Sequence, residues 1–286
     1  MTYRELCARL RAGGIENAEW DAACLIEHFC GAELLSLRAD PDRAYYSERL
    51  EDAVARRLTH TPLQYLLGEW TFYRQTYEVS PDCLIPRADT EILVEEAIRR
   101  LPTGARFADL CTGSGCIAVS TLAERPDTHA IAIEKFPQTL AIAERNADRN
   151  GVRARCTPML CDVLSPSDVP NDRFDALLSN PPYIATGELP TLSPEVHAEP
   201  REALDGGEDG LLFYRAILGH WTKTLKKDGF ILFEIGYDQA DAVSDLGRAH
   251  GFCATVRKDL GGNDRVVVLT RTDAGANAIH GKDLQP

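Results

Sequence analysis

Apolar residues recur at helical spacing through the first 60 residues of the chain. They form three groups that suit the inner faces of separate helices: Leu6 and Leu10; Ala22, Leu25, Ile26 and Phe29; and Leu50, Val54 and Leu58. Asn17 and Ser47 stand where helix N-caps are expected. Helices this short are unstable alone, so we expect a small bundle that forms an amino-terminal domain over residues 1–62.

The pattern changes between Pro62 and Pro86, where aromatic and β-branched residues replace the helical repeat. Those residues are Tyr65, Trp70, Phe72, Tyr73, Tyr77 and Val79. They favour strands, and Gly68 and the pair Arg74-Gln75 interrupt them as turns do. We therefore predict a β-hairpin over residues 63–86 that links two domains.

From Asp89 onward, short β-favouring runs alternate with helical patterns. The runs cover residues 107–110, 130–133, 154–160, 174–178, 230–235 and 266–269. This alternation predicts an α/β domain over residues 87–271, with a largely parallel sheet flanked by helices and an antiparallel strand over 264–270. The last residues, 272–286, have little to bury, and we expect a mobile tail.

Composition identifies the class of protein and removes several functions. The length of 286 residues predicts two domains or one domain with a substantial appendage. The composition, 44% hydrophobic and 26% charged, is typical of a soluble globular protein. No apolar stretch is long enough to cross a bilayer, and the amino terminus lacks the apolar core of a secretory signal. We expect a cytoplasmic protein without membrane contact. The nine cysteines include no Cys-x-x-Cys pair, which favours reduced thiols over disulfides or a metal site.

The formal net charge of −13 disfavours nucleic acid as a direct partner. Proteins that bind nucleic acid through its phosphates need a basic surface. Two groups of arginines could form a local basic patch or lie on solvated helix faces. They are Arg99, Arg100 and Arg106, and Arg145, Arg149 and Arg153.

A glycine-rich turn follows the first predicted strand of the α/β domain, as Asp109-Leu110-Cys111-Thr112-Gly113-Ser114-Gly115. Glycines at a strand-to-helix junction let a nucleotide-like ligand approach the backbone and the free N–H groups of the helix. Gly113-x-Gly115-x-x-Ala118 also satisfies the loose dinucleotide fingerprint, so NAD is one candidate. Asp109 would crowd a pyrophosphate but suits the ammonium group of a methionine moiety, which favours S-adenosylmethionine.

Two later acidic residues stand at strand ends. Glu134 can accept hydrogen bonds from both ribose hydroxyls, and the alternative is an N-cap for the next helix. Asp162 can accept from an adenine amino group, and the alternative is a turn acid before Leu164-Ser165-Pro166.

Asn180-Pro181-Pro182-Tyr183 ends another predicted strand in a rigid corner. Asn180 offers a carboxamide oxygen, and the Pro181 carbonyl stays free because prolines donate no backbone N–H. Two such acceptors can grip a planar NH2 group, which points to methylation of an amide or amine. Tyr183 can pack against that planar group. The alternative for the four residues is a plain turn that ends the strand, and the alternative for Tyr183 is an aromatic residue of the core.

Together, these motifs resemble class I S-adenosylmethionine methyltransferases that act on planar nitrogens. One such family methylates amino groups in nucleic acid, and another is the HemK/PrmC family, which methylates the glutamine of the Gly-Gly-Gln motif in peptide chain release factors. The chain resembles the second over nearly its full length, through segments at residues 64–65, 68–69, 84–91, 179–184, 199–200, 210–211 and 233–236. The resemblance implies a Rossmann-like domain of seven strands, a helical domain for substrate docking and a hairpin linker.

The resemblance also implies the site. The cofactor residues are Cys111, Thr112, Gly113, Ser114, Gly115, Glu134, Asp162, Val163 and Asn180, with Asp109 added by the argument above. Asn180, Pro181, Pro182 and Tyr183 hold the glutamine, and Asn180, Pro181 and Tyr183 are the catalytic set. Cys111 departs from the family pattern, which has a glycine there. No metal is expected, and the partner is a release factor bound by a monomer.

Three points stay open at this stage. Residues 84–91 and the pair Glu199-Pro200 look like walls of the family's site, whereas a plain interpretation makes Pro86 a linker corner and Asp89 an N-cap. A nucleic-acid amino-group methyltransferase shares the same catalytic corner. A noncatalytic binding module that keeps S-adenosylmethionine for stability is the third alternative.

Overall fold

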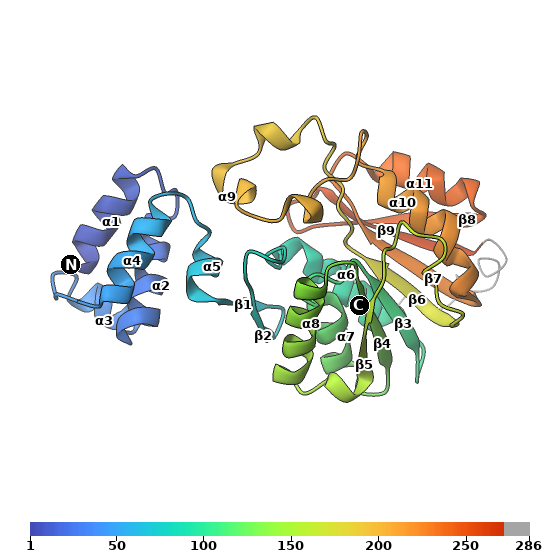
Figure 1. Ribbon diagram of the computed structural model, residues 1–286, viewed down its shortest axis with the longest axis horizontal. Coiled ribbons are helices and arrows are strands. Elements are labelled where there is room, and N and C mark those ends of the chain that lie inside the picture. The colour runs from blue at the N-terminus through green and yellow to red at the C-terminus, as the bar shows by residue number, and fades with distance from the viewer. Residues whose placement is uncertain (272–286) are drawn as a thin grey trace, which may run out of the picture.

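The computed structural model describes residues 1–271, and the tail expected over 272–286 lies outside the described residues. Short helices gather at the amino-terminal end of the chain, and a sheet covered by helices forms the other end (Figure 1). A helix and a small hairpin lie between these two parts. Within residues 1–271, no helix combines the length and apolarity needed to span a membrane.

The amino-terminal helices enclose a hydrophobic core of their own, built around Leu6, Leu25 and Val54. Thr2 caps the first helix through a capping box with Glu5. Asn17 and Ser47 occupy N-cap positions as predicted, but neither side chain makes a capping hydrogen bond. One short helix was missed because it holds only six residues. The helices are α1 (Tyr3–Ala12), α2 (Ala18–Cys30), α3 (Leu34–Ala39) and α4 (Glu48–Arg57).

The linker is more than the hairpin predicted over residues 63–86. It begins with α5 (Leu63–Leu67), continues as the antiparallel pair β1 (Glu69–Phe72) and β2 (Gln75–Glu78), and ends in a loop. The first part of that prediction was wrong because Tyr65 lies in a helix, where its hydroxyl donates to the Cys83 carbonyl (2.6 Å). The linker packs on the α/β domain, since the Tyr77 hydroxyl bonds Ser120 Oγ (2.6 Å).

The second part contains a seven-stranded sheet in the order β5-β4-β3-β6-β7-β9-β8. Strands β3 to β7 pair in parallel, and β9 pairs antiparallel with both β7 and β8. The predicted antiparallel strand over 264–270 is therefore confirmed, and the edge strand β8 was missed. The strands are β3 (Arg106–Leu110), β4 (His129–Glu134), β5 (Cys156–Leu160), β6 (Phe174–Ser179), β7 (Leu225–Glu234), β8 (Phe252–Lys258) and β9 (Asp264–Arg271).

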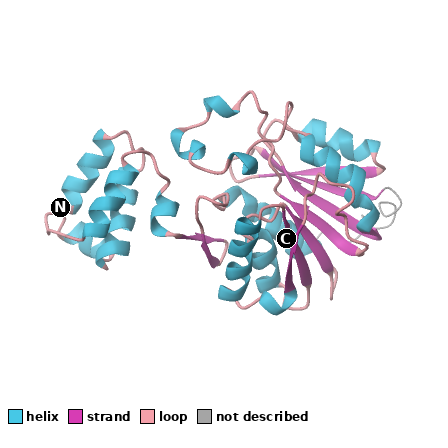
Figure 2. Ribbon diagram, viewed as in Figure 1, coloured by secondary structure: helices cyan, strands magenta, loops and turns pink. Residues whose placement is uncertain are grey.

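Helices cover both faces of this sheet, which makes a three-layer α/β/α arrangement (Figure 2). One face packs on residues such as Leu93, Ile117 and Ala147, and the other on Tyr214 and Val243. The first set belongs to α6 (Glu91–Arg100), α7 (Cys116–Glu124) and α8 (Pro137–Arg149); the second belongs to α10 (Leu212–Ala216) and α11 (Ala240–Ala249). The predicted α/β class with a helical domain and a hairpin is confirmed.

The strand order places a binding site at the middle of the sheet. Chain connections run outward from β3 through β4 to β5 on one side, and through β6 to β7 on the other. Ligands of such sheets bind beyond the carboxyl ends of the strands where the order reverses. An irregular segment over residues 180–211, which includes α9 (Pro194–His197), follows β6 at this edge.

Candidate active site

The glycine-rich turn joins β3 to α7 with three residues in left-handed backbone conformations. These are Cys111 (φ 60°), Gly113 (φ 56°) and Gly115 (φ 81°). Gly115 also allows close packing, because a Cβ there would lie 3.2 Å from the Ala143 Cβ of α8. Cys111 has the left-handed conformation although it has a side chain, so this position stores backbone strain.

Asp109 is the last residue but one of β3 and lies behind the turn. Its side chain is 0% exposed, and its Oδ2 atom accepts from Thr112 Oγ1 (2.6 Å) and from the Ala118 N–H (3.1 Å). Its Oδ1 atom has no hydrogen-bond partner among the described residues. Burial raises the pKa of Asp109 to about 7, against the lowering effect of those two donors. The carboxyl therefore holds the turn through Thr112 and Ala118. Its direct contact with the ammonium group of a ligand stays a prediction, and this geometry does not favour it.

Glu134 ends β4 beside the same turn. Its carboxylate accepts from the backbone N–H groups of Gly113 (3.1 Å), Lys135 (2.8 Å) and Phe136 (3.2 Å). Burial raises its pKa, while those three donors lower it. The alternative role as an N-cap is wrong, because Phe136 holds that position before α8.

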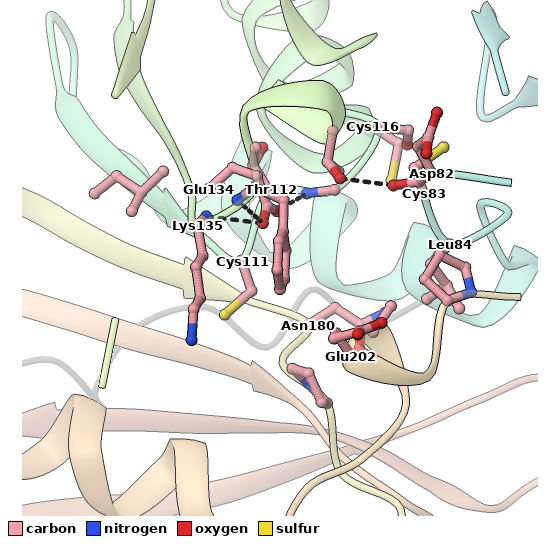
Figure 3. Close-up of a pocket in the computed structure, with 18 of the residues that line it drawn as sticks. Asp82, Cys83, Leu84, Cys111, Thr112, Cys116, Glu134, Lys135, Asn180 and Glu202 are labelled. Atoms are coloured by element: carbon pink, nitrogen blue, oxygen red, sulfur yellow. Dashed lines mark hydrogen bonds between the residues drawn. The ribbon is translucent and has the colours of Figure 1, made fainter. Parts of the chain in front are cut away.

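A cavity of about 340 Å³ opens at the carboxyl ends of β3, β4 and β6. Figure 3 shows Cys111, Glu134 and Asn180 around it, each at the carboxyl end of a different strand. Nine of the predicted site residues line it: Cys111, Thr112, Gly113, Ser114, Glu134, Asp162, Val163, Asn180 and Pro182. Asp109 and Gly115 do not, because they lie behind the turn.

Part of the wall comes from residues that sequence reasoning missed. Asp82 and Cys83 precede the segment 84–91, and the Asp82 carbonyl accepts from Thr139 Oγ1 of α8 (2.6 Å). Lys135 also lines the cavity and pairs its Nζ with Asp162 Oδ2 (2.9 Å). The other oxygen of Asp162 accepts from the Leu164 N–H (2.9 Å), so Asp162 is a turn acid that also lines the cavity.

The corner after β6 presents two free acceptors. Asn180 Nδ2 donates to Thr90 Oγ1 (3.2 Å), which turns the carboxamide oxygen away from Thr90. Within residues 1–271, neither Asn180 Oδ1 nor the Pro181 carbonyl accepts a hydrogen bond. Both oxygens are therefore open to a ligand, and their role toward a substrate NH2 group stays a prediction.

A second cavity, of about 180 Å³, adjoins the first at this corner. Its wall is largely apolar and includes Pro181 and Tyr183. Four residues line both cavities: Leu84, Arg87, Asn180 and Ala203. Asn180 thus lies where the two spaces meet.

Close backbone packing holds Tyr183 in place. A Cβ at Gly206 would lie 2.7 Å from Tyr183 Cα, and one at Gly210 would overlap the Tyr183 carbonyl oxygen. Gln239 Nε2 donates to that carbonyl (2.9 Å), while its Oε1 accepts from the Gly236 N–H (3.0 Å). Burial raises the pKa of the Tyr183 hydroxyl to about 12, so the ring stays neutral.

Ionic contacts support the walls of both cavities. The buried Glu199 carboxylate accepts from the Ile85 N–H (3.0 Å) and from Arg87. Asp89 is not an N-cap, because it lies in the short 3₁₀ turn Ala88–Thr90 and Thr90 holds the N-cap position of α6. Its carboxylate pairs with Arg265 (3.2 Å). Across residues 1–271, no group of three or more His, Cys, Asp or Glu side chains is arranged to hold a metal.

Comparison with known proteins gives the family. A model described as the PrmC N-terminal domain matches residues 2–68, and one described as the methyltransferase small domain matches residues 88–213. A release factor glutamine methyltransferase of Geobacter sulfurreducens is 41% identical over 89% of this chain and 90% of its own. One of Moorella thermoacetica is 38% identical over 94% and 97%. The chain belongs to the release factor glutamine methyltransferase family.

Membership of the release factor glutamine methyltransferase family confirms the resemblance drawn from the motifs and removes NAD as the expected ligand. A solved methyltransferase of Pyrococcus furiosus has a TM-score of 0.52 at 16% identity, over 68% of this chain and 88% of that one. That likeness shows the fold alone. The nucleic-acid methyltransferase and the noncatalytic module differ from the family in substrate and in chemistry, so an activity assay separates them.

Proposed function

We propose that this protein transfers a methyl group from S-adenosylmethionine to the side-chain amide nitrogen of the glutamine in the Gly-Gly-Gln motif of peptide chain release factors. The observation that carries the proposal is the meeting of two cavities at Asn180. The larger suits a nucleotide-sized ligand, and the smaller has room for one side chain. A reaction between two bound molecules requires such a meeting point.

The donor groups around the larger cavity fit S-adenosylmethionine. Glu134 presents a carboxylate to sugar hydroxyls, and the turn at Gly113 lets a ligand approach the backbone. Asp162 and Val163 line the part of the wall where we place the adenine ring. When bound, the cofactor supplies a methyl group attached to a positively charged sulfur.

The chain's own groups would then align and activate the amide. An amide nitrogen is a weak nucleophile because its lone pair is delocalised into the carbonyl. Asn180 Oδ1 and the Pro181 carbonyl would accept its two N–H groups, which orients the nitrogen and stabilises the positive charge that develops there. Tyr183 and Pro181 would pack against the planar amide in the smaller cavity. The methylated amide is acidic enough to release its extra proton to water, so no dedicated base is needed.

The helical domain would dock the release factor against this site. Arg57 of α4 pairs with Asp21 (2.6 Å) and with Glu195 of α9 (2.5 Å), which ties that domain to the segment beside the smaller cavity. The acidic surface suits a substrate rich in Arg and Lys. Because the described residues of one chain line both cavities, we propose that the protein acts as a monomer. We also propose that it acts in the cytoplasm, because translation terminates there.

A methyl-transfer assay tests the proposal. The purified protein receives S-adenosylmethionine with a labelled methyl group, together with an intact release factor, its Gly-Gly-Gln→Gly-Gly-Ala variant, or DNA. We expect label on the intact factor alone, located on that glutamine by mass spectrometry. Label on DNA would support the nucleic-acid methyltransferase, and no label would support the noncatalytic module.

Asn180→Ala tests the assigned mechanism within the same assay. Loss of one preorganised acceptor costs about 2–4 kcal/mol of transition-state stabilisation, or roughly 30- to 1,000-fold in turnover. Asn17→Ala is the control, since Asn17 is exposed and its side chain makes no capping bond. Turnover by Asn180→Ala close to that of the control would contradict the mechanism.

A further inference from the structure

A buried carboxyl lies next to the catalytic corner although it lines neither cavity. Glu234 is the last residue of β7, and the parallel register that pairs Ser179 with Phe233 brings Glu234 level with Asn180. Its side chain is only 1% exposed. The Oε2 atom has no hydrogen-bond partner among the described residues. The mechanism above gives this group no role.

Thr90 connects Glu234 to Asn180. Thr90 is 1% exposed, and its Oγ1 atom accepts a hydrogen bond from Asn180 Nδ2 (3.2 Å). The Thr90 Oγ1 atom carries one proton to donate, and the acidic group beside it is Glu234, whose pKa the Thr90 side chain lowers as a hydrogen-bond donor does. With that proton directed toward Glu234, the order of donors is Asn180 N–H to Thr90, and Thr90 O–H to Glu234.

This order decides how Asn180 is oriented. While Glu234 accepts the Thr90 proton, the Thr90 oxygen is left as an acceptor and selects the NH2 end of the Asn180 carboxamide. The Asn180 oxygen is then directed away from Thr90, as an acceptor for the substrate. If the Thr90 proton pointed toward Asn180 instead, the carboxamide would turn around and present donors to the N–H groups of the glutamine.

We infer that Glu234 is a positioning residue for methyl transfer, which acts through Thr90 to keep the Asn180 oxygen available to the substrate amide. The inference rests on the proposed function and assigns a role to a residue outside both cavities. A carboxylate performs this role because it is an acceptor only. A protonated carboxyl can itself donate to Thr90 and release the hydroxyl proton toward Asn180.

The surroundings of Glu234 allow this change near neutral pH. Burial raises its pKa to about 7, whereas the Thr90 hydrogen bond and the charge of Arg265 lower it. Arg265 is held in turn by Asp89 and Asp259, each at 3.2 Å. The elements around Glu234 contribute the titratable and charged groups that interact electrostatically with it: Arg265, Asp89, Arg87, Tyr183, Tyr214 and Cys116.

The test compares pH profiles of kcat at saturating S-adenosylmethionine, with the release factor as substrate. Only the ionised form of Glu234 is productive, so wild-type kcat should rise about tenfold between pH 6 and pH 8. Neither the glutamine amide nor the sulfonium group titrates in this range. In Glu234→Gln, kcat should vary less than about twofold over the same range and fall at least about fivefold below wild type at pH 8, with KM for the release factor within about twofold.

Two variants of Thr90 keep the test decisive if Glu234→Gln does not fold. Thr90→Val removes the hydroxyl at nearly constant volume and should reproduce the lowered, flat kcat. Thr90→Ser restores the hydroxyl and should recover both the level and the pH dependence. The inference is overturned if Glu234→Gln keeps the wild-type rise, or if Thr90→Val matches wild type at pH 8. Absence of methyl transfer by the wild-type protein at every pH would instead refute the proposed function.

Discussion

Gly206→Ala is the substitution with the clearest expected effect on catalysis. A Cβ at Gly206 would lie 2.7 Å from Tyr183 Cα, 2.8 Å from Tyr183 C and 2.9 Å from the Pro182 oxygen. All three are backbone atoms, so no side-chain rotation removes the overlap. Gly206 does not have a left-handed backbone, and the added methyl group therefore acts through its volume alone.

The size of the effect follows from the distance that must open. Ordinary contact begins near 3.4 Å, so the corner and the Gly206 loop have to separate by about 0.7 Å. Hydrogen bonds resist this movement, since the Gly206 N–H donates to the Ile184 carbonyl (2.8 Å) and the Ile184 N–H to the Leu204 carbonyl (3.0 Å). Overpacking of this kind costs about 1–3 kcal/mol of stability. A misplacement of about 1 Å in an active site costs on the order of 100-fold, so we expect kcat/KM to fall about 10- to 100-fold.

The assay measures kcat/KM for methylation of a release factor, together with the free energy of unfolding in urea. Gly187→Ala is a matched control, because Gly187 belongs to the same irregular segment and a Cβ there would meet nothing within 4 Å. The control should stay within about twofold of wild type. If Gly206→Ala also stays within that margin and unfolds at the same free energy, the close packing of Gly206 on Tyr183 does not position the corner, and the reasoning is refuted.

Two further predictions concern the glycine-rich turn. The pKa of Asp109 is raised to about 7 in the folded protein, so ionisation of this carboxyl lowers the free energy of unfolding as the pH rises through 7. The free energy of unfolding of Asp109→Asn, measured in urea at pH 5 and at pH 8, should therefore gain on the order of 2–3 kcal/mol relative to wild type between the two values. A difference between variant and wild type that is the same at both pH values would contradict this. At Cys111, where φ is 60°, the Cys111→Gly variant should have a free energy of unfolding about 1 kcal/mol higher than that of Cys111→Ala, because glycine adopts a left-handed backbone without strain. Elsewhere alanine is usually the more stable of the two. A more stable alanine variant would show that no strain is stored at this position.

The fold could be predicted where the sequence pattern repeats over a full element. The runs ending at Leu110, Ile133 and Leu178 are apolar because those strands are buried on both faces, and all three were found. Strand β8 was missed although Phe252, Ala254 and Val256 alternate, because only Phe252 is buried and the strand lies at the edge of the sheet. Tyr65 misled the linker prediction, since an aromatic residue suits a short helix that packs on its neighbours as well as a strand.

The site could be predicted as far as it depends on strand ends. Cys111, Glu134 and Asn180 each stand at the carboxyl end of a strand, and parallel strands bring such residues to one edge of the sheet. Asp109 shows the limit of this reasoning, because a residue at a strand end points either into the cavity or behind the turn, and only the packing of Thr112 and Ala118 decides which.

Residues that act through a neighbour leave a weaker trace in the sequence. Thr90 lies 90 residues before Asn180, and Glu234 lies in a strand whose place beside β6 depends on the order of the whole sheet. Once β6 and β7 are known to be parallel neighbours, the register alone puts Glu234 level with Asn180. A buried carboxyl at that level needs a donor, and the Thr90 side chain acts as one in lowering the pKa of Glu234. The sheet topology, rather than any local motif, is therefore the level at which the orientation of Asn180 becomes predictable.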